Sequence, residues 1–122
     1  MRARVSEGGI EQVGWLFMRL SGLALIFLAL GHFAIQHVIN DVHNLSLDFV
    51  ARRWAVLGWR IYDALLLALA LLHGLNGLRT ILADYTTRPG LRRGLQVAFF
   101  VLGTLIAIVG AIALIGGVRS TT

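Results

Sequence analysis

A histidine followed by an aspartate–tyrosine pair is the clearest chemical pattern in this sequence. His73 lies in an apolar stretch, and Asp84 and Tyr85 follow it by eleven and twelve residues. At about 100° per residue in a helix, eleven residues return the chain to within about 20° of the same face. Gly77 and Thr80 lie on that face between them. Imidazole suits the iron of a porphyrin, and glycine leaves room for a flat ring. A phenol beside a carboxylate could hydrogen-bond and protonate a lipid-soluble carrier.

Each part of this pattern also has a purely structural interpretation. A single histidine among apolar residues can hydrogen-bond a neighbouring helix, and glycines beside it can serve close helix packing. An Asp-Tyr pair at the end of an apolar stretch can anchor that end at a membrane–water interface. The spacing therefore suggests a redox site, and both interpretations stay open at this point.

The composition decides what kind of element must position these residues. Of the 122 residues, 57% are hydrophobic and only 14% are charged, which is too little charge for the surface of a soluble domain. The net charge is +5, and all eleven basic residues are arginines. They lie at the ends of apolar runs rather than on one polar face, which is typical of a membrane protein and not of nucleic-acid binding. Cysteine is absent, which excludes disulfides, thiolate metal sites and a cysteine nucleophile.

Three apolar segments predict an all-α integral membrane protein with three transmembrane helices. They cover about residues 13–39, 57–85 and 94–118, within a single membrane domain of residues 1–122. The third segment carries no charge and would rise roughly 38 Å as a helix, enough to cross a core of about 30 Å. The first segment is too long for a signal-peptide core, so we expect it to be retained.

The two linkers differ in character. In the first, Ser46 could cap a short amphipathic helix on the membrane surface. Its apolar residues are Leu47, Phe49, Val50, Trp54 and Leu57. The second linker, Thr86 to Arg93, is short, and its Pro89-Gly90 pair predicts a turn.

Arginine placement predicts the orientation, because arginines collect on the cytoplasmic side. With three spans, the N-terminal side holds seven arginines: Arg2, Arg4, Arg19, Arg79, Arg88, Arg92 and Arg93. The opposite side holds Arg52, Arg53, Arg60 and Arg119. We therefore expect a multi-pass protein of the cell inner membrane with a cytoplasmic N-terminus.

Other polar residues within the apolar segments need separate interpretation, because ionisable groups there are costly. His32 is deep enough in the first span to be a second axial ligand, although a hydrogen bond at a helix interface explains it more simply. Asp63 follows Arg60 by one turn and is expected to pair with it or to face lipid headgroups. Arg79 could snorkel to the interface, or neutralise Asp84 or a haem propionate.

The spacing from His73 to Asp84 and Tyr85, on the second of three spans, resembles that of the membrane-anchor subunits of succinate dehydrogenase (complex II). The stretch Phe17-Met18-Arg19-Leu20-Ser21-Gly22 is similar to the start of the first anchor helix in that family. The resemblance covers nearly the whole chain. It implies that His73 ligates haem b, that Arg19 lies near the haem propionates and the quinone pocket, and that Asp84 and Tyr85 belong to a ubiquinone or menaquinone site.

The resemblance also implies partners. They are a second membrane anchor that supplies the other axial ligand, an iron–sulfur subunit and a flavoprotein subunit, in a complex that could form trimers. With no dinucleotide fingerprint and no cysteine, this chain cannot itself carry flavin or clusters. It is thus expected to be a non-catalytic subunit of succinate:quinone oxidoreductase, in the bilayer and without nucleic acid.

Tyr85 favours the D-type anchor over its sister. In the sister the arginine at the position of Arg79 is followed by a second histidine, where this chain has Thr80. Three alternatives stay open: an anchor of a quinol:fumarate reductase, a purely structural anchor without haem, and a small proton-coupled transporter or accessory subunit. In the transporter, Asp63, His73 and Arg79 would form a proton path.

Overall fold

The computed structural model describes residues 7–117, and these residues are helical almost throughout, with no strand among them. Four α-helices follow one another: α1 (Glu7–Ala34), α2 (Leu47–Ala55), α3 (Leu57–Tyr85) and α4 (Pro89–Gly116). A π-helical turn, Ile35–Ile39, extends α1, and a 3₁₀ turn, Val42–Asn44, lies between it and α2. Arg2, Arg4, Val118 and Arg119, which enter the predicted spans or the charge count, lie outside the described residues.

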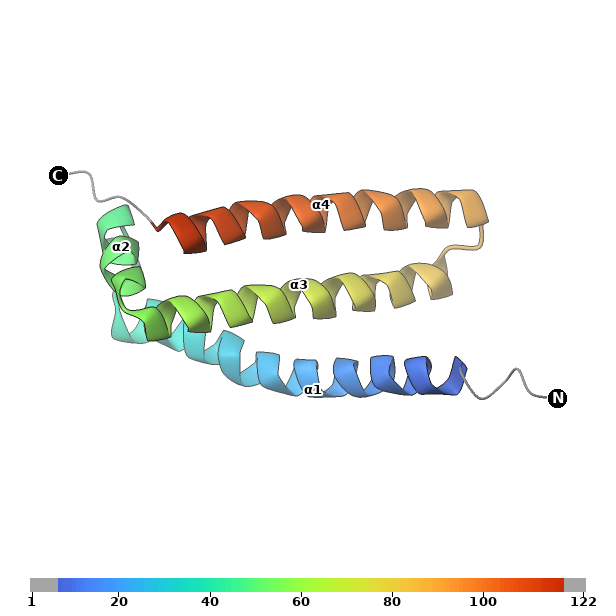
Figure 1. Cartoon of the computed structure of the whole chain (residues 1–122), viewed down its shortest axis with the longest axis horizontal. Coiled ribbons are helices and arrows are strands. Elements are labelled where there is room, and N and C mark those ends of the chain that lie inside the picture. The colour runs from blue at the N-terminus through green and yellow to red at the C-terminus, as the bar shows by residue number, and fades with distance from the viewer. Residues whose placement is uncertain (1–6, 118–122) are drawn as a thin grey trace.

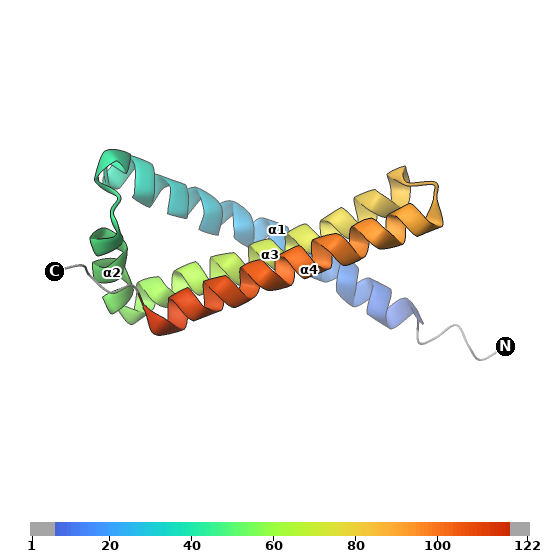
Figure 2. The ribbon, with the colours of Figure 1, turned by 90° about the horizontal axis from the view of Figure 1, so that it is seen from above.

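The three long helices form a bundle in which α1 crosses the pair formed by α3 and α4. Helices α3 and α4 lie side by side and antiparallel, and α1 contacts α3 on its other side (Figure 1). Seen from above, α1 crosses α3 and α4 obliquely (Figure 2). The start of α1 and the α3–α4 turn lie at one end of the molecule, and α2 lies across the other. We call the first the N-terminal end and the second the α2 end.

The three long helices can each cross a membrane by length and composition. The apolar stretches are Gly9–Ile39 (31 residues), Leu57–Tyr85 (29 residues) and Pro89–Gly116 (28 residues). Most of their large apolar side chains are exposed, and Leu114 is the single buried hydrophobic side chain among the residues described. Outward-facing apolar side chains are what hydrocarbon as a solvent requires. The all-α architecture with three long apolar helices and one shorter helix is confirmed.

The short helix begins where the sequence predicts. The Ser46 hydroxyl accepts a hydrogen bond from the Phe49 amide at 3.2 Å, which satisfies one of the free amides of the first turn. The helix ends at Ala55, however, and Leu57 already belongs to α3.

The second linker is shorter than predicted, and the Pro89-Gly90 pair does not form a turn within it. Helix α4 begins at Pro89, so only Thr86, Thr87 and Arg88 connect it to α3. Proline fits the first helical position because its missing amide would be unpaired there in any case. Arg92 and Arg93 therefore lie on the first turns of α4 rather than in a loop.

Glycines bring α3 and α4 close together. A Cβ atom on Gly103 would come within 2.6 Å of Leu75 Cδ1, and one on Gly110 would collide with Leu67. Small residues at such contacts let the two backbones approach, which is the usual basis of packing between membrane helices.

Candidate functional site

His73 lies on α3 where α1 crosses it. Its Nδ1 atom is 2.9 Å from the Ser21 hydroxyl of α1, a hydrogen bond between residues 52 positions apart. Ser21 is only 3% exposed, and its hydroxyl also lies 3.5 Å from the Met18 carbonyl oxygen. In the tautomer that carries its proton on Nδ1, the imidazole donates a hydrogen bond to the Ser21 oxygen, and the Ser21 hydroxyl can then donate to its own helix backbone.

Two glycines make room for this contact. A Cβ atom on Gly22 would lie 3.2 Å from His73 Cε1, so the imidazole packs directly against the α1 backbone. A Cβ atom on Gly77 would meet the end of the Met18 side chain at 3.5 Å. The imidazole plane is therefore fixed from one side by Ser21 and Gly22. Within residues 7–117 no hydrogen bond engages its Nε2 atom.

The role of Ser21 was not recognised from the sequence. It stands within the stretch from Phe17 to Gly22, but no residue pattern indicates which helix face meets His73. A small polar residue followed by glycine, Ser21-Gly22, is a usable signal, because membrane helices approach one another at small residues.

Asp84 and Tyr85 are the last two residues of α3, and both side chains are exposed. Tyr85 is 85% exposed, and within the described part of the chain neither side chain forms a hydrogen bond or an ion pair. The chain alone therefore presents both groups outward at the N-terminal end. Arg79 does not pair with Asp84.

Arg19 lies two residues before Ser21 on α1 and does not contact His73 in any hydrogen bond or ion pair of the described residues. Its guanidinium stacks over the Trp15 ring, 4.8 Å from the centroid. A cation–π contact of this kind holds the arginine without neutralising its charge.

A second polar cluster lies at the α2 end, and it corrects the expected partner of Asp63. The Asp63 carboxylate accepts hydrogen bonds from Arg53 Nη2 at 3.1 Å and from Trp54 Nε1 at 2.8 Å. Arg60 instead donates to the Trp54 carbonyl oxygen at 3.0 Å. The pairing differs because α2 folds back over the start of α3, which one-turn spacing along α3 cannot indicate.

His32 joins this cluster from α1. Its Nδ1 atom lies 3.3 Å from Asp63 Oδ1. The structure thus puts His32 beside an acidic side chain at the α2 end, whereas His73 lies at the helix crossing. No hydrogen bond connects Asp63, His73 and Arg79 directly with one another in the described residues.

No group of three or more histidine, aspartate or glutamate side chains that could hold a metal ion is found among residues 9–117. A haem needs no such group from one chain, because its porphyrin supplies four of the iron ligands and each axial position takes one side chain. His73 fits this requirement, since its Nε2 atom forms no hydrogen bond among the described residues.

The sequence is similar to a known family of membrane proteins. Residues 4–114 match the family described as succinate dehydrogenase/fumarate reductase transmembrane subunit. A relative from Archaeoglobus fulgidus, the succinate dehydrogenase hydrophobic membrane anchor subunit, is 34% identical over 99 residues. The match covers 80% of this chain and 82% of that protein.

Proposed function

Since the chain belongs to the succinate dehydrogenase/fumarate reductase transmembrane subunits, we propose that it co-ligates haem b and contributes to the quinone site of its complex. As a membrane anchor it is itself non-catalytic. Its complex includes soluble catalytic subunits, which we propose are a flavoprotein and an iron–sulfur subunit docked at the N-terminal end. Tyr85 supports the D-type assignment, with a second anchor as partner.

One observation carries the haem proposal: His73 is held by Ser21 and Gly22 with its Nε2 atom unengaged. A ligating imidazole usually donates its other N–H to a fixed acceptor, which sets its tautomer and its orientation. Ser21 is such an acceptor for Nδ1–H, and Nε2 then carries the lone pair for iron. When bound, haem b accepts and releases single electrons.

A residue of the second anchor would hold the haem together with His73, because His32 already lies against Asp63. His32 stays a candidate ligand only for a second haem. Arg19, held by Trp15 and without an acidic partner in the described residues, is placed to supply positive charge to the propionates and the quinone pocket.

For the quinone, the exposed Tyr85 phenol supplies a hydrogen bond to a quinone oxygen, and Asp84 orients that phenol or delivers a proton. Both lie at the end of α3 where the soluble subunits would dock, so electrons need travel only a short way from the clusters. We favour succinate oxidation with quinone reduction; quinol oxidation with fumarate reduction uses the same groups in the opposite direction.

The proposal is tested on the complex that co-purifies with a tagged copy of this chain. Haem is quantified from the reduced-minus-oxidised absorption spectrum and divided by the flavin content. We expect a b-type spectrum that His73→Ala abolishes while flavin still co-purifies, and that His43→Ala, an exposed histidine of the 3₁₀ turn, leaves unchanged. A full haem content in His73→Ala would refute ligation by this residue.

The quinone role has a separate test. Tyr85→Phe removes one hydrogen bond to the carrier and should slow quinone reduction by about tenfold, equivalent to roughly 1.4 kcal/mol. Succinate oxidation with a water-soluble dye as acceptor should continue at the wild-type rate, which serves as the internal control. Equal quinone reduction by the variant and the wild type would exclude Tyr85 from the site.

A further inference from the structure

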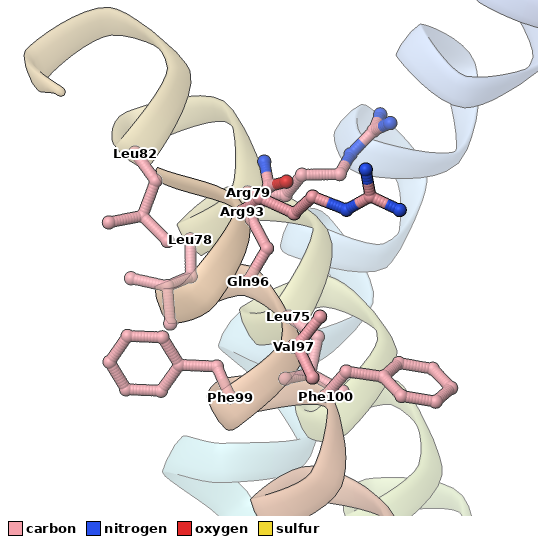
Figure 3. Close-up of a pocket in the computed structure, with 9 residues that line it drawn as sticks. All are labelled: Leu75, Leu78, Arg79, Leu82, Arg93, Gln96, Val97, Phe99 and Phe100. Atoms are coloured by element: carbon pink, nitrogen blue, oxygen red, sulfur yellow. The ribbon is translucent and has the colours of Figure 1, made fainter. Parts of the chain in front are cut away.

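A groove of about 380 Å³ runs between α3 and α4 toward the N-terminal end. Its walls are apolar side chains from both helices: Leu75, Leu78, Leu82, Val97, Phe99 and Phe100. Three polar side chains also line it, Arg79 from α3 and Arg93 and Gln96 from α4. Figure 3 shows the two arginine side chains extending in the same direction from their two helices.

This groove faces away from the proposed redox site. Arg79 follows His73 by six residues, which places it about 120° around α3 from the histidine. The histidine face packs on α1, whereas the groove is closed by α4 on the opposite side. Neither haem ligation by His73 nor the Ser21 contact uses any of its residues.

Both arginines lack an acidic partner. Within the described part of the chain neither Arg79 nor Arg93 forms an ion pair, and the two salt bridges found there both involve Asp63. Arg79 lies six residues, or about 9 Å along the axis, from the end of α3, within reach of the headgroup region by snorkelling. Arg93 lies on the second turn of α4, beside the same interface.

We propose that this groove binds one anionic phospholipid of the surrounding bilayer. The phosphate would be held by Arg79 and Arg93, with Gln96 as a further hydrogen-bond donor, and an acyl chain would lie along the leucine and phenylalanine walls. Basic pockets between transmembrane helices recognise anionic headgroups in this way. The apolar walls favour a lipid over free phosphate, because they can contact an acyl chain and form no favourable contact with an inorganic anion. The proposal does not depend on haem or quinone binding by this chain.

The test uses the purified complex after detergent removal of its lipids, with phosphatidylglycerol added back and bound lipid counted by native mass spectrometry. We expect one tightly bound phosphatidylglycerol per copy of this chain and no comparable retention of phosphatidylcholine. The double variant Arg79→Gln/Arg93→Gln should bind it about 25-fold more weakly, at roughly fivefold per arginine. Arg92→Gln, which removes a neighbouring charge outside the groove, is the matched control and should bind normally.

A second variant tests the acyl channel while keeping both charges. Val97→Trp fills the groove and should also weaken phosphatidylglycerol binding, whereas excess inorganic phosphate should not displace the lipid. Haem and flavin contents of all variants report intact assembly and separate this test from that of the redox site. The proposal is overturned if the double variant binds as tightly as Arg92→Gln, if phosphatidylcholine binds equally well, or if added quinone displaces the lipid one for one.

Discussion

A single hydroxyl determines how the central histidine of this subunit is presented. In hydrocarbon an imidazole N–H has no water to satisfy it, so the Ser21 contact orients the ring and, in the proposed haem-binding form, accepts the hydrogen bond of Nδ1–H. Hydrogen bonds between membrane helices contribute only about 0.6 kcal/mol on average. We therefore expect Ser21 to affect the orientation of the His73 imidazole more than the stability of the fold.

Replacing this hydroxyl tests that idea. Ser21→Ala leaves Nδ1–H without its acceptor, which makes the imidazole a poorer electron donor to iron. We expect a higher haem reduction potential and a lower haem-to-flavin ratio, with Ser21→Thr restoring both. Redox titration of the purified complex is the measurement.

Thr104→Ala provides the matched control for Ser21. Its hydroxyl donates to the Phe100 carbonyl oxygen of its own helix at 2.8 Å and touches no histidine. If Ser21→Ala and Thr104→Ala gave the same potential as the wild type, Ser21 would have no role in positioning His73.

How far the site could be predicted also differs from residue to residue. His73, Asp84 and Tyr85 were found because ionisable types are rare in an apolar stretch and a helix has a fixed period. Ser21 was missed because its contact is 52 residues away. The relative rotation of two helices depends on which small residues meet, and that is a property of both sequences together.

At the scale of elements, α3 packs against two helices, α1 and α4, through two different kinds of contact. Toward α1 it presents His73, and toward α4 it presents leucines that fit against Gly103 and Gly110. The position of α4 thus depends on the absence of two side chains.

Filling one of these contacts should separate the helices. Gly103→Leu puts a side chain where Leu75 already lies, and overpacking of this kind costs about 1–3 kcal/mol. We expect a lower thermal transition of the complex in detergent. Gly94→Leu, on the same helix with open space around it, should leave the transition unchanged, and equal effects of the two variants would contradict the packing argument.

A nearly buried ion pair connects the short helix α2 to α3. Asp63 joins Arg53 and Trp54 to α3, and the Arg53 side chain is only 6% exposed. Removing the carboxylate charge leaves this guanidinium without compensation.

Asp63→Asn is accordingly expected to destabilise the docking of α2 by about 3 kcal/mol. Faster proteolysis between α1 and α3 in membrane vesicles open on that side would report it. Asp41→Asn removes an exposed carboxylate from the same linker, and the protease should cleave this variant at the wild-type rate. Identical cleavage of both variants would mean that the Arg53 pair does not hold α2.

The elements themselves were largely predictable, because a long apolar stretch defines each span and Ser46 defines the start of α2. The α3–α4 linker was not. Pro89-Gly90 reads as a turn in isolation, yet proline is equally suited to the first position of a helix. The choice depends on apolar contacts of the residues that follow.

At the scale of the whole molecule, residues 9–117 have almost no interior of their own. Only Ser21, Arg53, Gly103 and Leu114 are buried among the residues that the structure describes, so the bilayer and the partner subunits supply most of the environment that an interior normally provides. Assembly and stability are coupled in such a subunit.

A prediction for haem stoichiometry follows at this scale. Under our proposal, each of the two anchors would supply one histidine to a shared haem, which predicts about half a haem per anchor in the complex. The chain expressed without its second anchor should retain none through purification, and co-expression should restore it. A ratio of about one haem per anchor would instead promote His32 to a ligand.

The three-residue connection between α3 and α4 has a consequence for biogenesis. Thr86, Thr87 and Arg88 span at most about 10 Å when extended, which is close to the distance between two packed helix axes. Neither helix can travel far from the other while the chain is being made. We therefore expect α3 and α4 to enter the bilayer together as a hairpin, with the arginines around the turn kept on the side from which synthesis proceeds.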